Sequence, residues 1–490
     1  MWDATKRYIR FFRPVLFLGS VVLLLLSCSP TKYLDENQYI LKDNKIILAE
    51  KSIDKAELKN YAVQKPNRSI LGWPMYISLY NMVDPVKEAK RDTKRAIDLK
   101  EKNEKRSEKG KKPKEDPFYL SRWWRNSVGE APIIYDAYSL KESNEGMLAY
   151  MRNLGYYHAQ LIDSTRFDKN KRRAIVEYHF KAHTPYKISE LNLKITDKRI
   201  DSIISTHTKL KIPDTGDLFN AYKLDNLRYQ ISKLLQNNGY YGFGPDQIVY
   251  FADTLKETME TKLDVELYQT TADGESLKSE SHFPIHYIKN VSILNYPYHL
   301  EDLQEKDLKV QYYGNDSIAF KYYDELSFKP YLLQRRIDIK GDSIFKQDDI
   351  ARSIRSVGGL GVFKSVHFKI TPSTEAIKSD SIKLLDVEVQ LSPAIKQSYS
   401  IDLEGYTSSG TIGTGLKFTY THRNLFKRAI FFDVSLNGKV ERSSSNLADN
   451  ESILAYEYGL NSTLRFPKFF APFRLYKFNN KYFPNTLINF

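Results

Sequence analysis

The chain has 490 residues, 41% of them hydrophobic, and a formal net charge of +14. This length exceeds what one hydrophobic core usually supports, so several domains are expected. The only cysteine, Cys28, excludes an internal disulfide. The 35 Tyr and 26 Phe residues are typical of β-rich or membrane-interface structure, and the positive charge indicates a phosphate-rich partner, either nucleic acid or lipid headgroups.

The first residues have the pattern of a bacterial export signal. Four cations within residues 6–13 precede an apolar run, Val15–Leu26. As a helix this run would span roughly 18 Å, less than the ~30 Å core of a bilayer, so it predicts a signal rather than an anchor. Leu25-Leu26-Ser27-Cys28 then resembles a lipobox.

This pattern predicts a signal peptide over residues 1–27 and lipid attachment at Cys28. The alternative is an incidental cysteine after an ordinary signal peptide. In either case the chain is exported, and nucleic acid is then not an expected partner.

A unit of strand, two helices, glycine-aromatic turn and two strands is predicted three times. The turn glycines are Gly155, Gly239 and Gly361, each at the end of a helix. Turns at Gly216 and Gly341 correspond between the second and third copies, which supports a true repeat. We predict domains over residues 28–183, 184–272 and 284–393, each a short sheet with two helices on one face.

Apolar spacings of three and four residues predict the helices of these units. The predicted helices are Ser52–Ala62, Ser139–Leu154, Asp197–Thr206, Ala221–Asn237 and Asp348–Val357. Ser52 is the expected N-cap of the first helix.

Residues 65–132 are too many for a connection within one unit and are predicted to be an insertion. The middle of the insertion, Lys87–Lys112, alternates acids and bases with almost no apolar residues. One interpretation is a solvated helix held by ion pairs; the other is a basic arm that touches headgroups or a partner. Aromatic residues interleaved with arginines follow, and they are expected either at a membrane interface or packed on their own domain: Phe118, Tyr119, Trp123 and Trp124.

After Pro393 the helical period gives way to strict alternation of apolar and polar residues. Four segments of about ten residues alternate in this way, at Gln397–Tyr406, Thr411–His422, Ile430–Glu441 and Tyr456–Phe466. A tilted strand of about this length crosses a bilayer core. Half-buried soluble sheets alternate similarly, but four such strands behind a lipobox favour a membrane β-barrel that begins within residues 394–490.

Together these motifs resemble the BamA/TamA superfamily of outer-membrane assembly factors, and the lipobox resembles its lipoprotein branch, TamL. The resemblance covers residues 28–490. It implies an α+β chain of tandem POTRA domains in the periplasm, followed by the first antiparallel strands of a transmembrane β-barrel in the outer membrane. Because four strands cannot close a barrel, the resemblance also implies further strands after Phe490.

The resemblance implies a protein without enzymatic activity or cofactor. Its expected partners are unfolded outer-membrane or secreted proteins, outer-membrane lipids and a TamB-like inner-membrane protein. Clients would add as strands to free edges at Tyr156–Asp163, Tyr240–Phe251 and Phe363–Ile370, and to the first barrel strand. The candidate pairing residues are Ser398, Tyr399, Ile401, Leu403, Tyr240 and Phe363.

Two alternatives stay open: a lipid-anchored periplasmic scaffold with a soluble β-domain, and a pore of the two-partner secretion type. No constellation predicts catalysis. His179 and His183, and likewise His282 and His286, lie four residues apart but lack the cysteine or carboxylate partners of a metal site. Glycine clusters precede strands rather than open helices, which argues against phosphate loops.

Overall fold

The structure, a computed structural model, describes residues 29–490 except 71, 271–275, 279–282, 298–306, 314–317, 324, 376–380, 409–410, 445–451 and 469–483. The predicted signal peptide and Cys28 lie outside the described residues. Two compact units contain the chain: Met1–Leu191 with Pro213–Leu224 and Ala252–Leu263, and Asn192–Ile212 with Asp225–Phe251 and Asp264–Phe490. None of the described helices has both the length and the apolar character needed to cross a bilayer.

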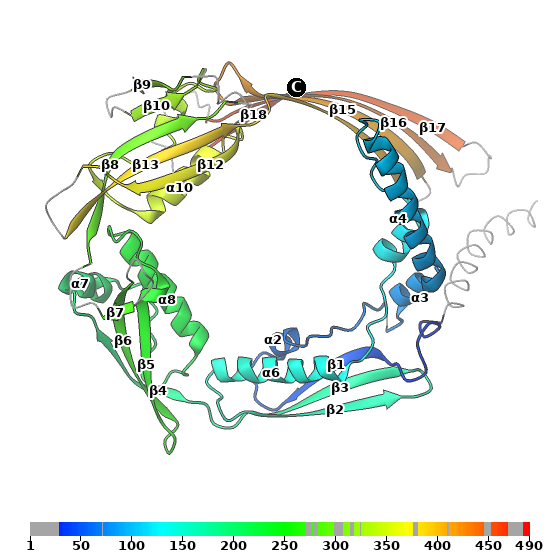
Figure 1. Cartoon of the computed structure of the whole chain (residues 1–490), viewed down its shortest axis with the longest axis horizontal. Helices are drawn as coiled ribbons and strands as arrows, with labels where there is room; N and C mark the ends of the chain where they lie inside the picture. The colour runs from blue at the N-terminus through cyan, green and yellow to red at the C-terminus, as the bar shows by residue number, and fades with distance from the viewer. Residues whose placement is uncertain are drawn as a thin grey trace, which may run out of the picture. The chain divides into compact units, whose positions relative to one another are not determined.

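The first repeat is a three-stranded sheet with two helices (Figure 1). Its elements are β1 (Ile40–Leu48), α2 (Lys55–Asn60), α6 (Ala137–Asn153), β2 (Gln160–Asp168) and β3 (Arg173–Lys181). The strand order is β1-β3-β2, with β1 parallel and β2 antiparallel to β3. Leu58, Met147 and Met151 are fully buried in one core with Val176 and Tyr178 of the central strand.

The N-cap of α2 differs from the prediction. The side chain of Asp54, not Ser52, accepts a hydrogen bond from the Ala56 amide at 2.8 Å. The Ser52 hydroxyl instead donates to the Glu50 carboxylate at 2.8 Å. Both residue types cap helices, so sequence alone could not choose between them.

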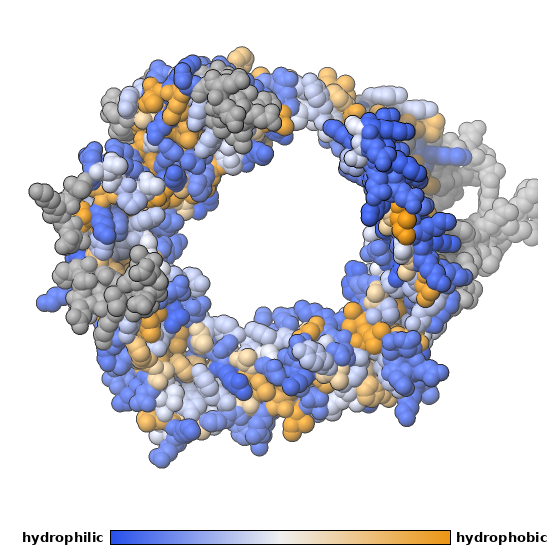
Figure 2. Space-filling view, in the orientation of Figure 1, coloured by the Kyte–Doolittle hydropathy of each residue, from blue (hydrophilic) through white to orange (hydrophobic). Residues whose placement is uncertain are grey.

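The insertion is helical. It contains α3 (Met75–Asn81), α4 (Pro85–Ser107), α5 (Leu120–Trp123) and a π-helical turn, Trp124–Val128. The Asp84 side chain caps α4 by accepting from the amides of Val86 and Lys87. The face of α4 seen in Figure 2 is mainly hydrophilic, in line with the charge alternation, although Val86 and Ile97 of this helix are exposed.

The second repeat has the same element order as the first. It comprises β4 (Lys187–Lys194), α7 (Lys198–Thr206), α8 (Ala221–Gln236), a 3-10 turn (Pro245–Gln247), β5 (Ile248–Leu255) and β6 (Glu260–Thr270), with β7 (Ser276–Lys278) added. The strand order is β4-β6-β5, and β7 pairs with β6.

The third repeat has a wider sheet than predicted. Its elements are β8 (Ile285–Asn295), β9 (Lys309–Tyr313), β10 (Ile318–Tyr322), α9 (Tyr331–Gln334), β11 (Ser343–Ile344), α10 (Gln347–Gly358), β12 (Phe363–Pro372) and β13 (Ile382–Pro393). The strand order is β12-β13-β8-β10-β9, with β11 also paired to β8. The sequence pattern predicts an insertion between Leu294 and Leu326, and β9 and β10 of that segment extend the sheet.

One rule of strand order holds in all three repeats. The strand that follows the glycine turn, β2, β5 or β12, is at an edge of its sheet, and the next strand, β3, β6 or β13, lies between it and the first strand of the repeat. The strands β2 and β5 begin later than predicted, at Gln160 and Ile248, because short turns separate them from the glycines.

The four alternating segments form one antiparallel sheet, called here the long-strand sheet. It consists of β14 (Gln397–Ser408), β15 (Thr411–Leu425), β16 (Ile430–Ser444), β17 (Ser452–Phe466) and β18 (Thr486–Asn489), in that order. The strands β15 to β17 each have 15 residues, longer than predicted. The short strand β18 pairs with β17 and was not predicted. The predicted α+β class, tandem small domains followed by long antiparallel strands, is confirmed.

The turn glycine of the first repeat belongs to a joint with the start of the second. The Gly155 carbonyl accepts from the Tyr186 amide at 2.9 Å, and the Tyr186 carbonyl accepts from the Phe219 amide at 2.9 Å. The Tyr157 ring stacks on Phe219 at 5.9 Å and meets Tyr186 edge-on at 5.6 Å. Gly155 has a φ of 97°, and a Cβ there would lie 2.9 Å from the Phe219 oxygen.

The second joint repeats this arrangement with different residues. The Gly239 carbonyl accepts from the His286 amide at 2.8 Å, and the His286 carbonyl accepts from the Phe345 amide at 2.9 Å. The Tyr241 ring packs against His286 and Phe345, at 5.6 and 5.1 Å. The His286 ring Nδ1 also lies 3.2 Å from the Gly239 oxygen. Because that oxygen can only accept, Nδ1 carries the hydrogen.

The third glycine faces the long-strand sheet. A Cβ on Gly361 would lie 2.9 Å from the Phe431 ring of β16. Phe431 and Ala429 belong to the core of the third repeat, and the Arg465 guanidinium covers the Phe431 ring at 3.9 Å. The Asn424 side chain secures this turn by donating to the Ser327 carbonyl at 2.6 Å and accepting from the Ala429 amide at 2.9 Å. The third repeat and the base of the long-strand sheet therefore share one core.

We predict that Gly239→Ala weakens the second joint more than backbone strain alone requires. A Cβ there would lie 2.7 Å from Ile285 Cγ2 and 2.9 Å from Ile344 Cγ1. Gly216→Ala is the matched control, since Gly216 has a φ of 94° with nothing within 4 Å of its Cβ position. The control should lose about 1–2 kcal/mol from left-handed strain, and Gly239→Ala about 1–3 kcal/mol more. If both variants lost the same stability in thermal unfolding and the same hydrogen-exchange protection at the His286 amide, the close contact at Gly239 would not be needed for the joint.

The second joint should also weaken in acid. Burial lowers the pKa of His286, and nearby Lys383 adds to this effect. The unfolded chain therefore takes up this proton more readily, so the stability from neutral His286 is complete above about pH 6.5 and is lost as pH falls through the folded pKa. Unfolding free energies measured from neutral pH downward should decline more in the wild type than in His286→Gln, which keeps a neutral donor. If the unfolding free energies of the two proteins fell in parallel with pH, neutral His286 would not stabilise the joint.

Candidate functional site

One face of the long-strand sheet is apolar and uncovered. The register places Tyr399 beside Tyr420, Ile401 beside Phe418, and Leu403 beside Leu416, and the next pairs continue across β16 and β17. Tyr399, Ile401 and Leu403 are 67%, 71% and 79% exposed, and Tyr458 is 81% exposed. The apolar face is completed by Ile412, Leu436, Val440, Leu454, Tyr456 and Leu460, all of them exposed.

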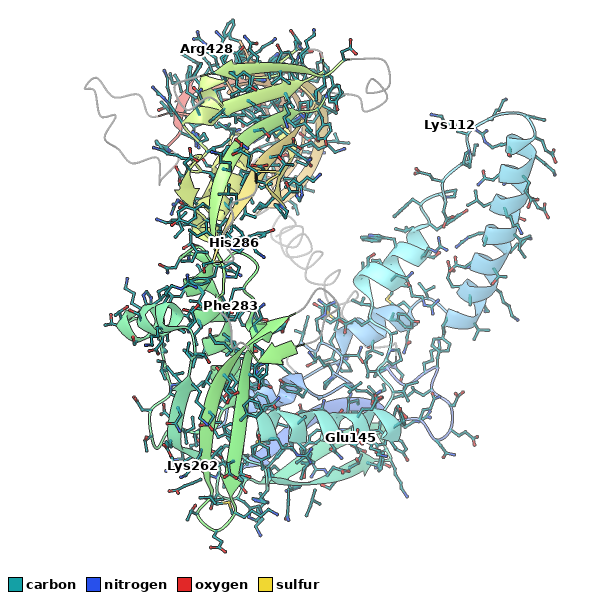
Figure 3. All side chains as sticks on the ribbon, turned by 60° about the vertical axis from the view of Figure 1, so that its left-hand side comes forward. Lys112, Glu145, Lys262, Phe283, His286 and Arg428 are labelled. Atoms are coloured by element: carbon teal, nitrogen blue, oxygen red, sulfur yellow. The ribbon has the colours of Figure 1, made fainter. Side chains whose placement is uncertain are left out.

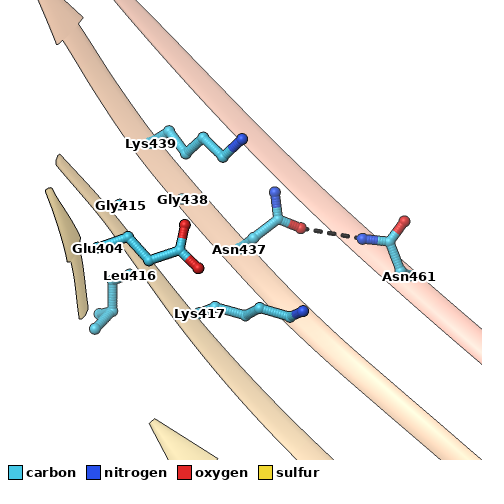
Figure 4. Close-up of a pocket in the computed structure, with 8 residues that line it drawn as sticks. All are labelled: Glu404, Gly415, Leu416, Lys417, Asn437, Gly438, Lys439 and Asn461. Carbon is cyan, nitrogen blue, oxygen red and sulfur yellow. Dashed lines mark hydrogen bonds between the residues drawn. The ribbon is translucent and has the colours of Figure 1, made fainter. Parts of the chain in front are cut away.

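The opposite face of the same sheet is polar. Asp402 lies beside Lys417, which lies beside Asn437; Glu404 and Lys439 flank Gly415. A shallow depression of about 250 Å³ forms here over Gly415, which carries no side chain between Glu404 and Lys439 (Figure 4). Its polar lining includes Glu404, Lys417 and Lys439, and the Asn461 amide donates to the Asn437 side chain at 3.1 Å. The sheet therefore has one apolar and one hydrated face.

A tyrosine fills the space above another glycine of the polar face. A Cβ on Gly413 would lie 2.4 Å from Cζ of Tyr406, so the ring rests directly on this glycine. The Tyr406 hydroxyl donates to the Glu441 carboxylate on β16. One aromatic side chain thus ties together β14, β15 and β16, a contact that strand alternation gave no means of predicting.

The outer edge of β14 has no partner strand among the described residues. The Lys396 carbonyl accepts from the Arg423 amide at 2.8 Å, next to the Gln397–His422 pair. Hydrogen-bonded and non-hydrogen-bonded pairs alternate in an antiparallel ladder. The backbones of Ser398, Ser400 and Asp402 therefore face β15, whereas those of Tyr399, Ile401 and Leu403 turn outward.

The opposite edge of this sheet is also partly open. The strand β18 pairs with β17 only over Thr463–Phe466, and Ser462 exchanges backbone hydrogen bonds with Phe490 at 2.9 and 3.2 Å. The N-terminal half of β17 has no neighbour on that side among the described strands. Two incomplete edges thus border one apolar face.

The predicted pairing residues divide into two groups. Tyr399, Ile401 and Leu403 combine an exposed apolar side chain with an outward backbone, while Ser398 lies on the polar face with its backbone toward β15. Tyr240 is buried and precedes β5, and Phe363 is the buried first residue of β12. In the edge strands of the repeats, exposed apolar side chains occur instead at Ile162, Phe167, Phe251 and Leu255.

A further exposed edge lies outside the segments predicted as strands. In β9, at the edge of the third sheet, Val310 and Tyr312 are 50% and 67% exposed, while Tyr313 packs toward the core. The alternation Val310-Gln311-Tyr312-Tyr313 was the only signal, and it is too short to distinguish from a loop.

Metal chemistry has no support in the part of the chain that the structure describes. No group of three or more His, Cys, Asp or Glu residues there could hold a metal ion. His179 and His183 are on the same segment without such partners, His286 is part of the second joint, and His282 lies outside the described residues.

Comparison with known proteins gives no match to a family model or to a curated protein. Among solved structures, the chain is similar to POTRA domains 3–5 of BamA from Haemophilus influenzae, with 9% identity, 74% of this chain and 99% of that chain covered, and a TM-score of 0.31. It is also similar to BamA from Haemophilus ducreyi lacking POTRA domains 1–3, with 12% identity, coverage of 58% and 48%, and a TM-score of 0.30.

A third similar structure is CdiB from Acinetobacter baumannii, with 10% identity, coverage of 57% and 49%, and a TM-score of 0.24. The chain thus spans about half the length of the second and third of these structures. Similarity at this level does not establish a family, so the functional conclusions depend on the geometry of the chain itself.

We predict that Gly413→Ala loosens the first three strands of the long-strand sheet. The new methyl group would displace the Tyr406 ring and break its hydrogen bond to Glu441, at a cost of about 1–3 kcal/mol. Gly405→Ala on β14 is the control, because nothing lies within 4 Å of its Cβ position. Hydrogen exchange over β14 and β15 should increase in the first variant only. Equal exchange in both variants would contradict a structural role for the Tyr406–Gly413 contact.

Proposed function

We propose that the chain is an outer-membrane assembly or translocation factor of the BamA/TamA type, and specifically of its lipoprotein branch, TamL. Its repeats act as POTRA domains in the periplasm, and its long-strand sheet lies in the outer membrane. Cys28 carries the lipid anchor, and clients are unfolded outer-membrane or secreted proteins. A TamB-like inner-membrane protein is a further proposed partner.

The observation that carries this proposal is the uncovered apolar face of the long-strand sheet. Each large apolar side chain gains about 1.5–3 kcal/mol when it leaves water, and more than ten of them share this face. A soluble sheet would cover such a face with a second layer. Acyl chains are the partner that fits a single-layered sheet with one apolar and one hydrated face, and strands of 12–15 residues are long enough to cross the bilayer core at a tilt.

The free edge of β14 supplies a mechanism for client handling. Three successive outward residues, Tyr399, Ile401 and Leu403, present backbone donors and acceptors without a partner strand among the described residues. An unpaired backbone group in lipid costs several kcal/mol, so this edge will accept an extended client segment that satisfies it. The incoming strand would bury its own apolar side chains on the same face. Backbone pairing and apolar burial together provide the driving force, and neither a nucleotide nor an enzymatic step is required.

The edge strands of the repeats offer earlier contacts for the same client. Each of β2, β5 and β12 is at an edge of its sheet, where an extended segment can add without disturbing the core. Ile162 of β2 is 71% exposed and gives that edge an apolar contact as well. We propose that clients remain extended on such edges before they reach β14.

Strand addition at the free edge of β14 can be tested with the substitution Ile401→Pro. Proline removes the outward N–H of this residue while leaving the pairs of Ser400 and Asp402 with β15 in place. One lost inter-strand hydrogen bond, worth up to about 1.5 kcal/mol, corresponds to a roughly tenfold lower rate if pairing limits insertion. We expect that loss when the protein, reconstituted in liposomes, inserts an unfolded eight-stranded outer-membrane barrel as probe.

Two matched variants control this experiment. Ile401→Ala keeps the N–H and should insert the probe at nearly the wild-type rate. Asp402→Pro removes a hydrogen bond of the β14–β15 ladder and gives the insertion rate expected when the sheet itself is disrupted. A folded Ile401→Pro protein that inserts the probe at an unchanged rate would refute strand addition at the β14 edge. If ion conductance is then the only activity, a secretion pore is the better conclusion. A monomer that stays soluble without detergent or lipid anchor would instead establish the scaffold.

A further inference from the structure

The insertion in the first repeat forms a helical arm, defined here as residues 85–123. Its base is held by a charge network around Glu88, whose side chain is completely buried. Arg91 and Arg95 lie 3.3 and 2.9 Å from this carboxylate, and the Ser121 hydroxyl donates to it at 2.6 Å. These hydrogen bonds outweigh burial and hold the pKa of Glu88 below its ordinary value. The network joins α4 to the returning segment.

Further contacts make the base a fixed structure. Arg122 pairs with Asp92 at 3.5 Å and also with Asp116. The Arg95 guanidinium lies 3.9 Å above the centre of the Tyr119 ring. Every arginine of α4 before residue 100 is therefore engaged in an ion pair within the arm.

The far end of the arm, residues 105–114, is called here the basic tip. It is folded back on α4 by backbone contacts: the Asn103 side chain donates to the Lys114 carbonyl at 3.0 Å and accepts from the Lys114 amide at 2.7 Å. Arg106 Nε donates to the Lys112 carbonyl at 2.9 Å. Gly110 makes the turn with a φ of 64°. Lys112 is thereby positioned at the end of the arm (Figure 3).

The cations of the basic tip differ from those at the base. The tip contains six cations and a single carboxylate, Glu108. The ammonium groups of Lys109, Lys111, Lys112 and Lys114 have no carboxylate within ion-pair distance in the described chain, and all four residues are exposed. Holding like charges on a pinned loop is unfavourable unless an anion neutralises them.

Exposed apolar side chains lie on the returning segment, between the basic tip and the base of the arm. Phe118, Leu120 and Trp123 are 72%, 66% and 44% exposed, and the rings of Phe118 and Trp123 are 6.4 Å apart. Trp124 and Arg125, in contrast, contact α3 through the Leu79 carbonyl and the Tyr80 hydroxyl. Of the aromatic residues singled out in the sequence, Tyr119 and Trp124 therefore pack within the first repeat, whereas Phe118 and Trp123 are exposed.

We propose that the basic tip binds the phosphate headgroups of an anionic bilayer surface. Lysines attract such a surface at about 1 kcal/mol each, and exposed Phe, Leu and Trp side chains gain free energy at the headgroup level. The combination favours a bilayer over nucleic acid, because acyl chains can cover the aliphatic Leu120 as well as the rings of Phe118 and Trp123, whereas nucleic-acid bases stack on the rings alone. The arm would give the first repeat its own attachment to a membrane surface.

The test is flotation of the full-length protein with vesicles of phosphatidylcholine, alone or mixed with phosphatidylglycerol. The long-strand sheet will bind either vesicle, so the measured quantity is the preference for anionic vesicles. Replacing Lys109, Lys111, Lys112 and Lys114 with Gln should decrease that preference at least about tenfold, and raised salt should do the same to the wild type. The control variant replaces four exposed lysines of the first repeat, Lys51, Lys55, Lys169 and Lys171, with Gln and changes the net charge equally.

The outcomes separate the possible ligands. A decrease confined to the tip variant, with unchanged binding to phosphatidylcholine, supports a headgroup site. An equal decrease in the control would show that only net charge matters and would overturn the proposal. Stronger competition by single-stranded DNA than by anionic vesicles would identify the tip as a nucleic-acid site and overturn it as well. Phe118→Ser with Trp123→Ser should weaken binding to both vesicle types, and no change would exclude the aromatic contribution.

Discussion

A sheet that is one layer thick cannot keep a continuous apolar face in water, and this constraint limits the environments in which the long-strand sheet, residues 397–489, can lie. Tyr399, Ile401 and Leu403 on β14 are continued by Leu436 on β16 and Tyr458 on β17, and the described chain offers no second layer against them. The hydrated face behind them, with Glu404, Lys417 and Lys439, excludes burial of both sides. A bilayer on one side and water on the other satisfies both faces at once.

In the repeats, the glycine turns connect small domains to one another in a defined order. At each of the first two joints a left-handed glycine lets the backbone approach the next repeat, and an aromatic residue two positions later packs on it. The third contact differs, because Gly361 faces the Phe431 side chain of β16 and apolar packing joins the last repeat to the long-strand sheet. The first two joints depend instead on backbone hydrogen bonds, which are more sensitive to geometry than apolar contacts.

Sequence reasoning could predict what depends on local periodicity. The main helices were located to within a few residues, and the alternating segments were recognised as strands because their period of two was unbroken. It could not predict β9, β10 and β18, whose short segments have no distinctive period, nor the Asp54 cap, where two suitable residues compete. The Tyr406–Gly413 contact and the outward backbone of Ile401 depend on register, which a single sequence does not specify. The three glycines were identified as helix ends, but their role as close-contact points needed coordinates.

In the proposed function, the free edge of β14 is also where a client would be exchanged at small net cost. The outward backbone groups of Tyr399, Ile401 and Leu403 have no partner strand among the described residues. Each hydrogen bond from an incoming strand would satisfy one of these groups, so pairing is favourable from the first residue. The inward bonds of Ser400 and Asp402 to β15 are not disturbed, so β14 can serve as a template without unfolding. Release then requires only that a better partner, such as another strand of the client itself, compete for the same groups. An edge that binds by backbone pairing and discriminates little among side chains would fit the proposed role, in which many different clients are handled.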